Sequence, residues 1–319
     1  MSDHKPVLVS GVKPTGDLHI GNYFGAMRQL AELSASNKYK CFIFVADYHA
    51  LNTMQEAEEM KRRTRELVMA YLTIGLDPKE VIFFKQSDVP AHTELAWIFD
   101  TITAMPYLMR AHAFKDAEAK SREISVGTFN YPMLMAADIL LYDAAVVPVG
   151  QDQKQHIEYA RDTAEKFNRV FKTDVFKLPE PYIMSEVAVV PGTDGQKMSK
   201  SYGNVIPLFA SRDELAKCVM GIVTDSSGTR PENVYAIHKL VRNEQELEQM
   251  YAEHEGNYKA LKEMLIEDLD RYLAPMRAKC EELVDNSDIV DEVLIRGKRE
   301  ARAVSEAKME QVRAAIGVA

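Results

Sequence analysis

Lysines and serines that could bind a polyphosphate are concentrated in GQKMSKSYGN, residues 195–204. Lys197 and Lys200 supply two ammonium groups, and Ser199 and Ser201 supply hydroxyl donors beside them. Cations and hydroxyl donors grouped in such a loop can hold and stabilise an anion. Glycines on both flanks allow the loop to close over a ligand and to open again. A solvated loop without function is the simpler interpretation, so other segments must supply the evidence for a nucleotide.

A second candidate for anion binding is GVKPTGDLHIGN, residues 11–22, which joins the first apolar run to the first helical pattern. Backbone N–H groups and the helix dipole favour an anion at such a junction. The segment matches neither the dinucleotide-binding nor the P-loop motif. Gly11, Gly16 and Gly21 permit tight turns and the close approach of a flat or charged ligand. A glycine-containing connection without a ligand is the alternative.

A carboxylate in apolar surroundings is predicted in YPMLMAADILLY, residues 131–142. Tyr131, Met135 and Asp138 recur at i, i+4 and i+7, so they share one face of a helix, and Pro132 suits its first turn. Burying the Asp138 carboxylate is costly unless a hydrogen-bond donor meets it. That donor is either a group of the protein, such as a backbone N–H or an arginine, or a polar group of a substrate.

Together the three segments resemble the class I aminoacyl-tRNA synthetases, in which a P-x-G-x-L-H-I-G-N type of loop precedes a distant KMSKS loop. Residues 131–142 are similar to the substrate helix of the tryptophan-specific members, where Y-P-x-L-M-A-A-D-I-L is typical. VPVGQDQKQHIE, residues 147–158, resembles their V-G-[ED]-D-Q-K-Q-H. The resemblance implies that L-tryptophan and ATP, with Mg²⁺, give the aminoacyl-adenylate, and that the acyl group then moves to tRNA(Trp). It also implies a cytoplasmic homodimer with no tightly bound cofactor and no protein-held metal.

The resemblance further implies the roles of individual residues. The groups assigned to catalysis are His19, Lys197, Ser199, Lys200 and Ser201. ATP is expected to contact Lys13, Pro14, Thr15, Gly21, Asn22, Gly150, Gln151, Asp152, Ile183, Lys197, Met198, Ser199, Lys200 and Ser201. Tryptophan is expected to contact Asp138 through its indole N–H, and also Met135, Tyr131, Gln153 and His49.

The sequence departs from the family pattern where an aromatic residue is usual, at Val9, and where glutamine is usual, at Lys13. The motif F-K-x-K becomes FKDA over residues 114–117, so one phosphate-binding lysine is missing from its usual place. Lys13, Lys115 and Lys120 are the candidates to replace it. These departures indicate a divergent branch and affect phosphate binding more than the choice of tryptophan.

Apolar runs separated by helical patterns must position these groups. Buried strands are predicted for residues 7–10, 41–51, 81–87 and 144–150, with helices between them. This alternation predicts a Rossmann-like α/β fold with a parallel sheet, whose ligands lie beyond the carboxyl ends of the strands. After residue 205 amphipathic segments dominate. We therefore expect a catalytic domain over 1–204 and an all-helical domain over 205–319, which by resemblance binds the anticodon.

The composition limits the class of protein. The chain has 319 residues, of which 46% are hydrophobic and 27% charged, as in a globular protein. A net charge of −9 argues against a nonspecific nucleic-acid binder. The three cysteines lie far apart without a C-x-x-C pair, which argues against a disulfide framework or a cysteine-based metal site and fits a reducing compartment. The sequence shows neither a signal-peptide pattern nor an apolar run long enough to cross a bilayer.

Three alternatives remain at this point. The tyrosine enzyme shares the fold and places an aspartate near its substrate, although Met135 and the M-A-A-D-I-L context favour a bicyclic ring. A non-catalytic RNA- or protein-binding relative would be expected to have a degraded KMSKS loop, and here the loop is intact. A nucleotidylyltransferase would need neither KMSKS nor a helical tail. The basic stretches at 61–66 and 296–303 either contact tRNA phosphates or are solvated helix faces.

Overall fold

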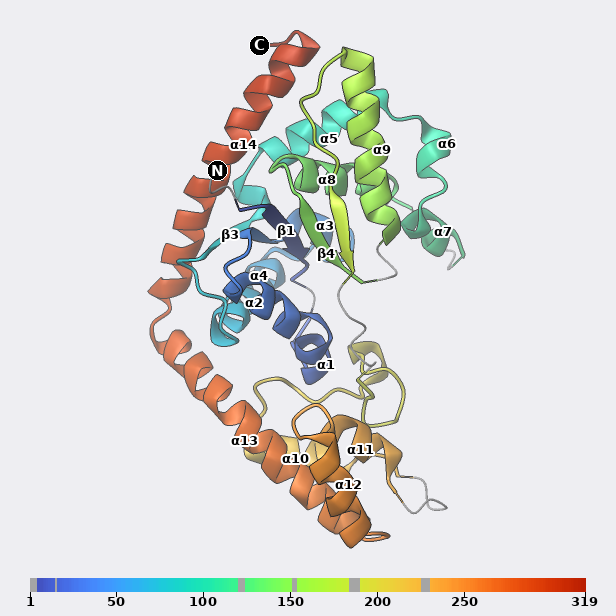
Figure 1. Cartoon of the computed structure of the whole chain (residues 1–319), viewed down its shortest axis with the longest axis vertical. Helices are drawn as coiled ribbons and strands as arrows, with labels where there is room; N and C mark the ends of the chain where they lie inside the picture. The colour runs from blue at the N-terminus through green and yellow to red at the C-terminus, as the bar shows by residue number, and fades with distance from the viewer. Residues whose placement is uncertain (1–4, 15, 120–123, 151–153, 184–189, 225–229) are drawn as a thin grey trace.

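The computed structural model describes residues 5–14, 16–119, 124–150, 154–183, 190–224 and 230–319 (Figure 1). Its centre is a five-stranded parallel sheet in the order β3-β2-β1-β4-β5. The strands are β1 (Val7–Val12), β2 (Lys40–Val45), β3 (Val81–Lys85), β4 (Val146–Val149) and β5 (Glu180–Ile183). The order reverses beside β1, which confirms the predicted Rossmann-like sheet and marks the ends of β1 and β4 as the place for a ligand.

Neighbouring strand residues point to opposite faces of the sheet, and this alternation divides the core. Leu8 and Ile43 belong to one apolar cluster, which includes residues of α4 (Ala57–Thr73). Val9 and Phe42 belong to a second cluster on the other face. Among the helices that contribute to this second cluster are α5 (Ala91–Ile102), α8 (Val126–Leu140) and α9 (Lys154–Phe171). Helices therefore cover both faces, as parallel sheets require.

The segments next to the sheet differ from the local predictions. The predicted strand over 41–51 ends at Val45, and Asp47–Ala50 form the short helix α3 because the N–H of Ala50 bonds back to the carbonyl of Ala46. The predicted first helix contains a π-helical turn, η1 (Tyr23–Met27), between α1 (Ile20–Asn22) and α2 (Arg28–Ala35). Such turns are frequent at functional sites.

The prediction that Pro132 occupies the first turn of its helix is wrong. Helix α8 begins at Val126, because the Ser125 hydroxyl accepts a hydrogen bond from the Thr128 N–H at 3.2 Å. Pro132 therefore lies inside the helix, where its missing N–H leaves one carbonyl of the preceding turn without its usual partner. Tyr131, Met135 and Asp138 nevertheless remain on one continuous helix.

Two shorter helices, α6 (Met105–Leu108) and α7 (His112–Ala119), connect α5 to α8. Residues after 205 form α10 (Arg212–Met220), α11 (Glu232–His238), α12 (Glu244–Glu253), α13 (Tyr258–Asp285) and α14 (Asp288–Ile316). Helices α10, α11 and α12 lie at one end of the molecule, and α13 runs from that end back to α4 (Figure 1). In the described part of the chain no helix is both long and apolar enough to cross a membrane.

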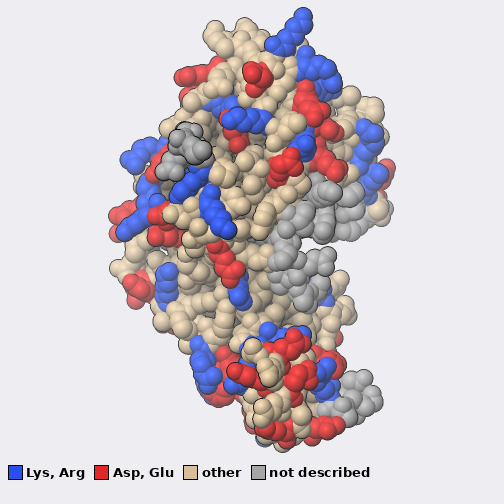
Figure 2. Space-filling view, viewed as in Figure 1, with Lys and Arg blue, Asp and Glu red and all other residues tan. Residues whose placement is uncertain are grey.

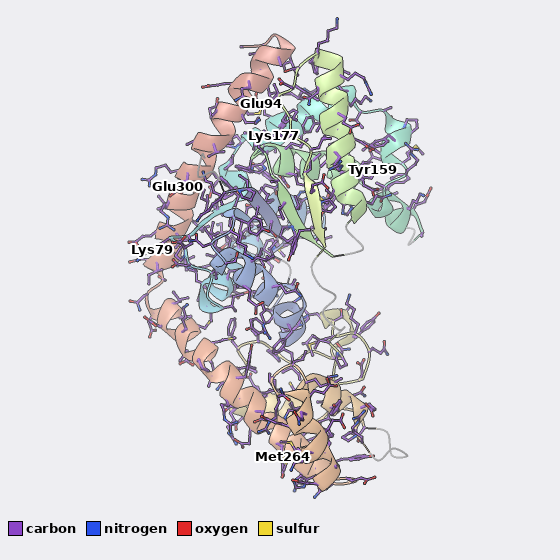
Figure 3. The ribbon with its side chains drawn as sticks, in the orientation of Figure 1. Lys79, Glu94, Tyr159, Lys177, Met264 and Glu300 are labelled. Atoms are coloured by element: carbon purple, nitrogen blue, oxygen red, sulfur yellow. The ribbon has the colours of Figure 1, made fainter. Side chains whose placement is uncertain are left out.

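Helix α14 runs back along the sheet and covers the edge strand β3 (Figure 1). A Cβ on Gly297 would lie 1.8 Å from the carbonyl oxygen of Phe83, so only glycine lets the helix backbone come this close. Arg313 pairs with Glu94 of α5 at 2.7 Å, and Glu94 is labelled in Figure 3. The sequence does not predict this return of the chain, and the proposed boundary near residue 205 stays a prediction.

Candidate active site

A cavity of about 930 Å³ opens at the ends of β1 and β4. It is bounded by the first loop, α8, the end of β4 and the KMSKS loop. The predicted site residues that line it are Lys13, His19, Gly21, Asn22, His49, Tyr131, Met135, Asp138, Gly150, Lys197, Met198, Ser199 and Ser201. Segments far apart in sequence thus present the predicted phosphate-binding and substrate-binding groups to one space.

The first loop fits closely against the KMSKS loop. A Cβ on Gly21 would lie 2.9 Å from His19 Nδ1 and 3.2 Å from Met198 Cβ, so a larger residue would push the two loops apart. His19 is buried. Burial is the larger cause that lowers the pKa of its imidazole, and the positive charge of Lys200 is the smaller one, so the imidazole is neutral at neutral pH. Asn22 Oδ1 accepts a hydrogen bond from the His19 N–H at 3.1 Å, which turns the Asn22 amide N–H groups toward other acceptors.

The KMSKS loop is held from inside by Asn204, which is only 2% exposed. Asn204 Oδ1 accepts from the Ser199 N–H at 2.7 Å, and Asn204 Nδ2 donates to the Lys197 carbonyl at 3.2 Å. The same Nδ2 donates to the Asp194 carboxylate at 2.6 Å. The motifs do not single out this residue, although it follows Gly203 directly at the end of segment 195–204. A polar residue that ends a glycine-flanked motif is a usable signal for such a role.

The two lysines of the loop are placed differently. Lys197 lines the cavity, whereas Lys200 does not. The Lys200 ammonium lies 3.2 Å from a carboxylate oxygen of Asp17 in the first loop. The hydroxyls of Ser199 and Ser201 are 2.9 Å apart and both line the cavity. The loop thus has one cation and two hydroxyls directed at the cavity, and a second cation held beside it.

Asp138 is 3% exposed and is held by three side chains. His49 Nε2 lies 2.9 Å from Oδ2, while His92 Nδ1 and Gln86 Nε2 lie 2.6 and 2.7 Å from Oδ1. His92 Nε2 is in turn 2.9 Å from the Tyr142 hydroxyl. None of these partners is the backbone N–H or arginine considered from the sequence. Gln86 and His92 were not identified either; a histidine within the apolar helix AHTELAWIFDTI is the signal that was available.

These contacts determine the charge of the Asp138 side chain. Burial by itself would raise the pKa of the carboxyl, but hydrogen bonds from His49 and His92 outweigh it and lower the pKa below its ordinary value. An ionised carboxylate has about four acceptor positions. Three are used by the protein, two on Oδ1 and one on Oδ2, and Asp138 also lines the cavity. One acceptor position on Oδ2 is therefore left for a donor in the cavity.

Tyr131 and Lys13 form the side of the cavity next to Asp138. The ring centroids of Tyr131 and His49 are 4.4 Å apart, and the Lys13 ammonium lies 4.6 Å from the Tyr131 centroid. Burial lowers the pKa of Lys13, and burial with the nearby Asp138 charge raises the pKa of Tyr131 to about 12. Of the lysines considered as replacements, Lys13 lines the cavity and Lys115 is exposed on α7.

The remaining predicted residues are less informative. Pro14 borders a neighbouring cavity with Lys13, and Ile183 is the last residue of β5. The predictions outside the described residues concern Thr15, Lys120, Gln151, Asp152 and Gln153.

The basic stretches at 61–66 and 296–303 make many contacts within the protein. Ion pairs join Arg62 to Glu59 and Arg65 to Asp291. Charges of both signs are mixed over the face in Figure 2. These contacts occupy part of the charge of the first stretch, and a role of either stretch in tRNA binding stays a prediction.

Comparisons with known proteins agree with the geometry. Residues 1–282 match the sequence model of the family tRNA synthetases class I (W and Y). A tryptophan–tRNA ligase of Fusobacterium nucleatum is 45% identical over 318 residues, covering 97% of this chain and 97% of that protein. One of Campylobacter jejuni is 42% identical, covering 98% of this chain and 99% of that protein.

Solved structures give the same result. The crystal structure of tryptophanyl-tRNA synthetase from Campylobacter jejuni complexed with ADP and tryptophan superposes with a TM-score of 0.90 at 41% identity, covering 97% of this chain and 99% of that one. A tyrosyl-tRNA synthetase from Archaeoglobus fulgidus superposes with a TM-score of 0.66 at 19% identity, covering 88% and 91%, and thus shares the fold. The resemblance inferred from the motifs is confirmed.

Proposed function

This chain belongs to the class I tryptophan–tRNA ligases, and we propose that the cavity at the ends of β1 and β4 is where it activates L-tryptophan with ATP. A tryptophan carboxylate oxygen attacks the α-phosphorus, a new P–O bond forms, and the bond to the β-phosphate breaks to release pyrophosphate. The 2′- or 3′-hydroxyl of the terminal adenosine of tRNA(Trp) then attacks the carbonyl carbon, and AMP leaves. The observation that carries this proposal is the ionised Asp138 carboxylate in the same cavity as the KMSKS loop.

Asp138 selects the amino acid. Its remaining acceptor position suits the indole N–H, and the fixed donors around it prevent the carboxylate from turning toward another partner. Phenylalanine can enter the cavity but would leave that acceptor unpaired in apolar surroundings. A site built around one such hydrogen bond discriminates by roughly 10⁴–10⁵, the scale known for a site that reads the hydroxyl of tyrosine. Met135 packs on the indole ring, and Tyr131 helps to hold the α-amino group.

The ATP phosphates bind between the two loops. Lys197, Ser199 and Ser201 line the cavity and supply the charge and donors that stabilise the leaving pyrophosphate. Mg²⁺ enters with the nucleotide, because this ion is usually held by substrate phosphates and few protein ligands. In the part of the chain that the structure describes, no group of three His, Cys, Asp or Glu side chains could hold a metal. Thr15, Gln151, Asp152 and Gln153 remain predicted contacts.

The assembly belongs to the same proposal. Trp97 of α5 is 70% exposed, Met105 of α6 is 66% exposed, and Val126 at the start of α8 is 75% exposed. Exposed apolar side chains of this size are candidates for a subunit interface, and we propose that the chain forms a homodimer, as its relatives' family pattern implies. We place the enzyme in the cytoplasm and assign recognition of the tRNA anticodon to the helical residues after 205.

The test is amino-acid-dependent ATP–pyrophosphate exchange with tryptophan, tyrosine and phenylalanine, on the wild type and Asp138→Asn. We expect exchange that strongly favours tryptophan, and loss of that preference in the variant. Charging of tRNA(Trp) by the wild type tests the second step. Thermal melting of both proteins separates a loss of selectivity from a loss of folding, because the variant loses charge-assisted contacts to two histidines. Exchange favouring tyrosine would overturn the assignment of the substrate.

A further inference from the structure

One lysine of the KMSKS loop is bound to the first loop. The Lys200 ammonium lies 3.2 Å from Asp17 Oδ2, and a Cβ on Gly16 would lie 2.4 Å from the same ammonium. Gly16 has a φ of +78°, so glycine is favoured there both by the backbone and by the lysine lying over it. Burial lowers the pKa of Lys200, and the Asp17 charge offsets part of this effect. The Lys200 ammonium therefore occupies a defined position, beside the Asp17 carboxylate and over Gly16.

Asp17 has a second cationic partner that fixes its position. Arg63 of α4 forms an ion pair with the other carboxylate oxygen of Asp17. The Arg63 side chain is only 13% exposed, and its Nε donates to Glu59 at 2.7 Å. The Asp17 carboxylate therefore lies between a lysine on a movable loop and an arginine anchored on a helix.

This arrangement leaves the Lys200 ammonium paired with a carboxylate of the protein. Lys197, Ser199 and Ser201 line the active-site cavity, and Lys200 does not. To neutralise a leaving pyrophosphate, its ammonium must exchange the Asp17 carboxylate for phosphate oxygens. A tripolyphosphate carries several negative charges against the single charge of Asp17, so this exchange is favourable once ATP is bound.

We infer that Asp17, positioned by Arg63, is a latch that holds Lys200 on the first loop before ATP binds and releases it to the β- and γ-phosphates as the KMSKS loop closes. Asp17 is then a positioning residue that acts through Lys200. The inference rests on the proposed function for the role of Lys200. A second cavity of about 360 Å³ is lined by Asp17 and Arg63 among others, so there is space next to the Asp17 side chain.

The latch has a kinetic signature that a purely structural role lacks. It exists only before ATP binds, so removing it raises the free energy of the free enzyme and leaves the ATP complex and the transition state unchanged. Such a change lowers KM and the Kd for ATP with little effect on kcat. Because the Asp17 side chain is 70% exposed, the pair has the strength of a surface ion pair. We expect Asp17→Asn to tighten ATP binding about twofold to fivefold.

The experiment measures the Kd of the non-hydrolysable analogue AMP-PNP with Mg²⁺ by calorimetry, and KM and kcat for ATP by pyrophosphate exchange. Glu66→Gln is the control for a change in nearby charge, because Glu66 also acts on Lys200 by its charge, while its own ion pairs are with Arg62 at 2.6 Å and, at a longer 3.8 Å, with Arg63. The latch predicts that AMP-PNP binds more tightly to Asp17→Asn than to the wild type, and that Glu66→Gln changes the Kd much less. It also predicts that the difference in Kd between Asp17→Asn and the wild type becomes smaller at high ionic strength. It also predicts that Asp17→Asn has no effect on binding in a Lys200→Met background.

Several results would overturn the latch. Equal effects of Asp17→Asn and Glu66→Gln on ATP binding would indicate that any nearby negative charge acts in this way, without a specific pair. An effect of Asp17→Asn that persists in the Lys200→Met background would exclude Lys200 as the partner of Asp17. A higher KM with a lower kcat would make Asp17 a structural part of the loop. The binding measurement contains no tryptophan. Absence of tryptophan-dependent exchange in the folded wild type would therefore count against the proposed function, whereas an unchanged Kd for Asp17→Asn would count against the latch.

Discussion

Replacing Asn204 is expected to disable the KMSKS loop without unfolding the protein. Its side chain bonds to the backbone of Ser199 and Lys197 and to the carboxylate of Asp194. All three contacts lie within residues 194–204, so they order this loop rather than the surrounding core. The loop must be ordered for its cations and hydroxyls to meet the phosphates, so the loss is expected in the ATP-dependent step.

The magnitude follows from the two bonds to the loop backbone. Each is worth about 1 kcal/mol net, so Asn204→Ala removes about 2 kcal/mol of loop ordering. If only the ordered loop reacts, kcat/KM for ATP falls about thirtyfold, because 1.4 kcal/mol corresponds to a factor of about ten. The assay is pyrophosphate exchange at saturating tryptophan. We expect the melting temperature to change little.

Exchanging the amide and the carboxylate of the Asn204–Asp194 pair refines this test. Asn204→Asp places two carboxylates at the 2.6 Å that a hydrogen bond now spans, so it is expected to be more damaging than Asn204→Ala. Adding Asp194→Asn restores a donor opposite the new carboxylate and is expected to recover part of the activity. Recovery is incomplete, because a carboxylate at 204 still faces the Lys197 carbonyl at 3.2 Å. A value of kcat/KM for Asn204→Ala close to that of the wild type would refute this reasoning.

Three further predictions concern the core and the substrate side. Gln86→Leu removes a charge-assisted bond to Asp138, so the KM for tryptophan is expected to rise about tenfold or more in pyrophosphate exchange while the KM for ATP changes little. Gly297→Ala forces a methyl group against the Phe83 carbonyl, and urea unfolding is expected to show a loss of about 3 kcal/mol. Burial raises the pKa of Asp100 to about 6, so the carboxyl stays protonated to a higher pH in the folded state than in the unfolded state. The folded state therefore loses stability as the pH rises from about 4 through 6. Asp100→Asn should therefore raise the melting temperature at pH 7 and give no gain at pH 4.

Much of the sheet could be predicted because it depends on local sequence. The apolar runs that begin at Val7, Cys41 and Val81 are buried on both faces, so they leave a clear signal. Strand β5 leaves none, since it is only Glu180–Ile183 and contains a proline. The docking of α14 on β3 depends on Gly297 meeting a backbone more than two hundred residues away, and no local pattern encodes that contact.

The candidate site shows the same division. The motifs identify groups whose chemistry is fixed by type and spacing, such as Lys197 and Asp138. They do not identify the partners of those groups. Gln86 and His92, which hold Asp138, lie outside the motifs, and Asp17 lies in the first loop but meets Lys200 only in the folded chain. A buried carboxylate predicts that donors exist without predicting which residues supply them.

The two carboxylates also explain why one contact can be permanent and the other exchangeable. Asp138 is buried, so losing a hydrogen-bond donor would leave its negative charge unpaired in the protein interior, which is costly in free energy. Its three partners therefore hold the carboxylate in the same position in every turnover. Asp17 is largely exposed, so water replaces Lys200 when the ammonium leaves, and breaking the pair costs little. A buried pair at that position would hold the lysine against ATP, and an exposed carboxylate at position 138 could be satisfied by water without an indole. Burial, more than residue type, therefore decides which aspartate sets the substrate and which one releases the catalytic lysine.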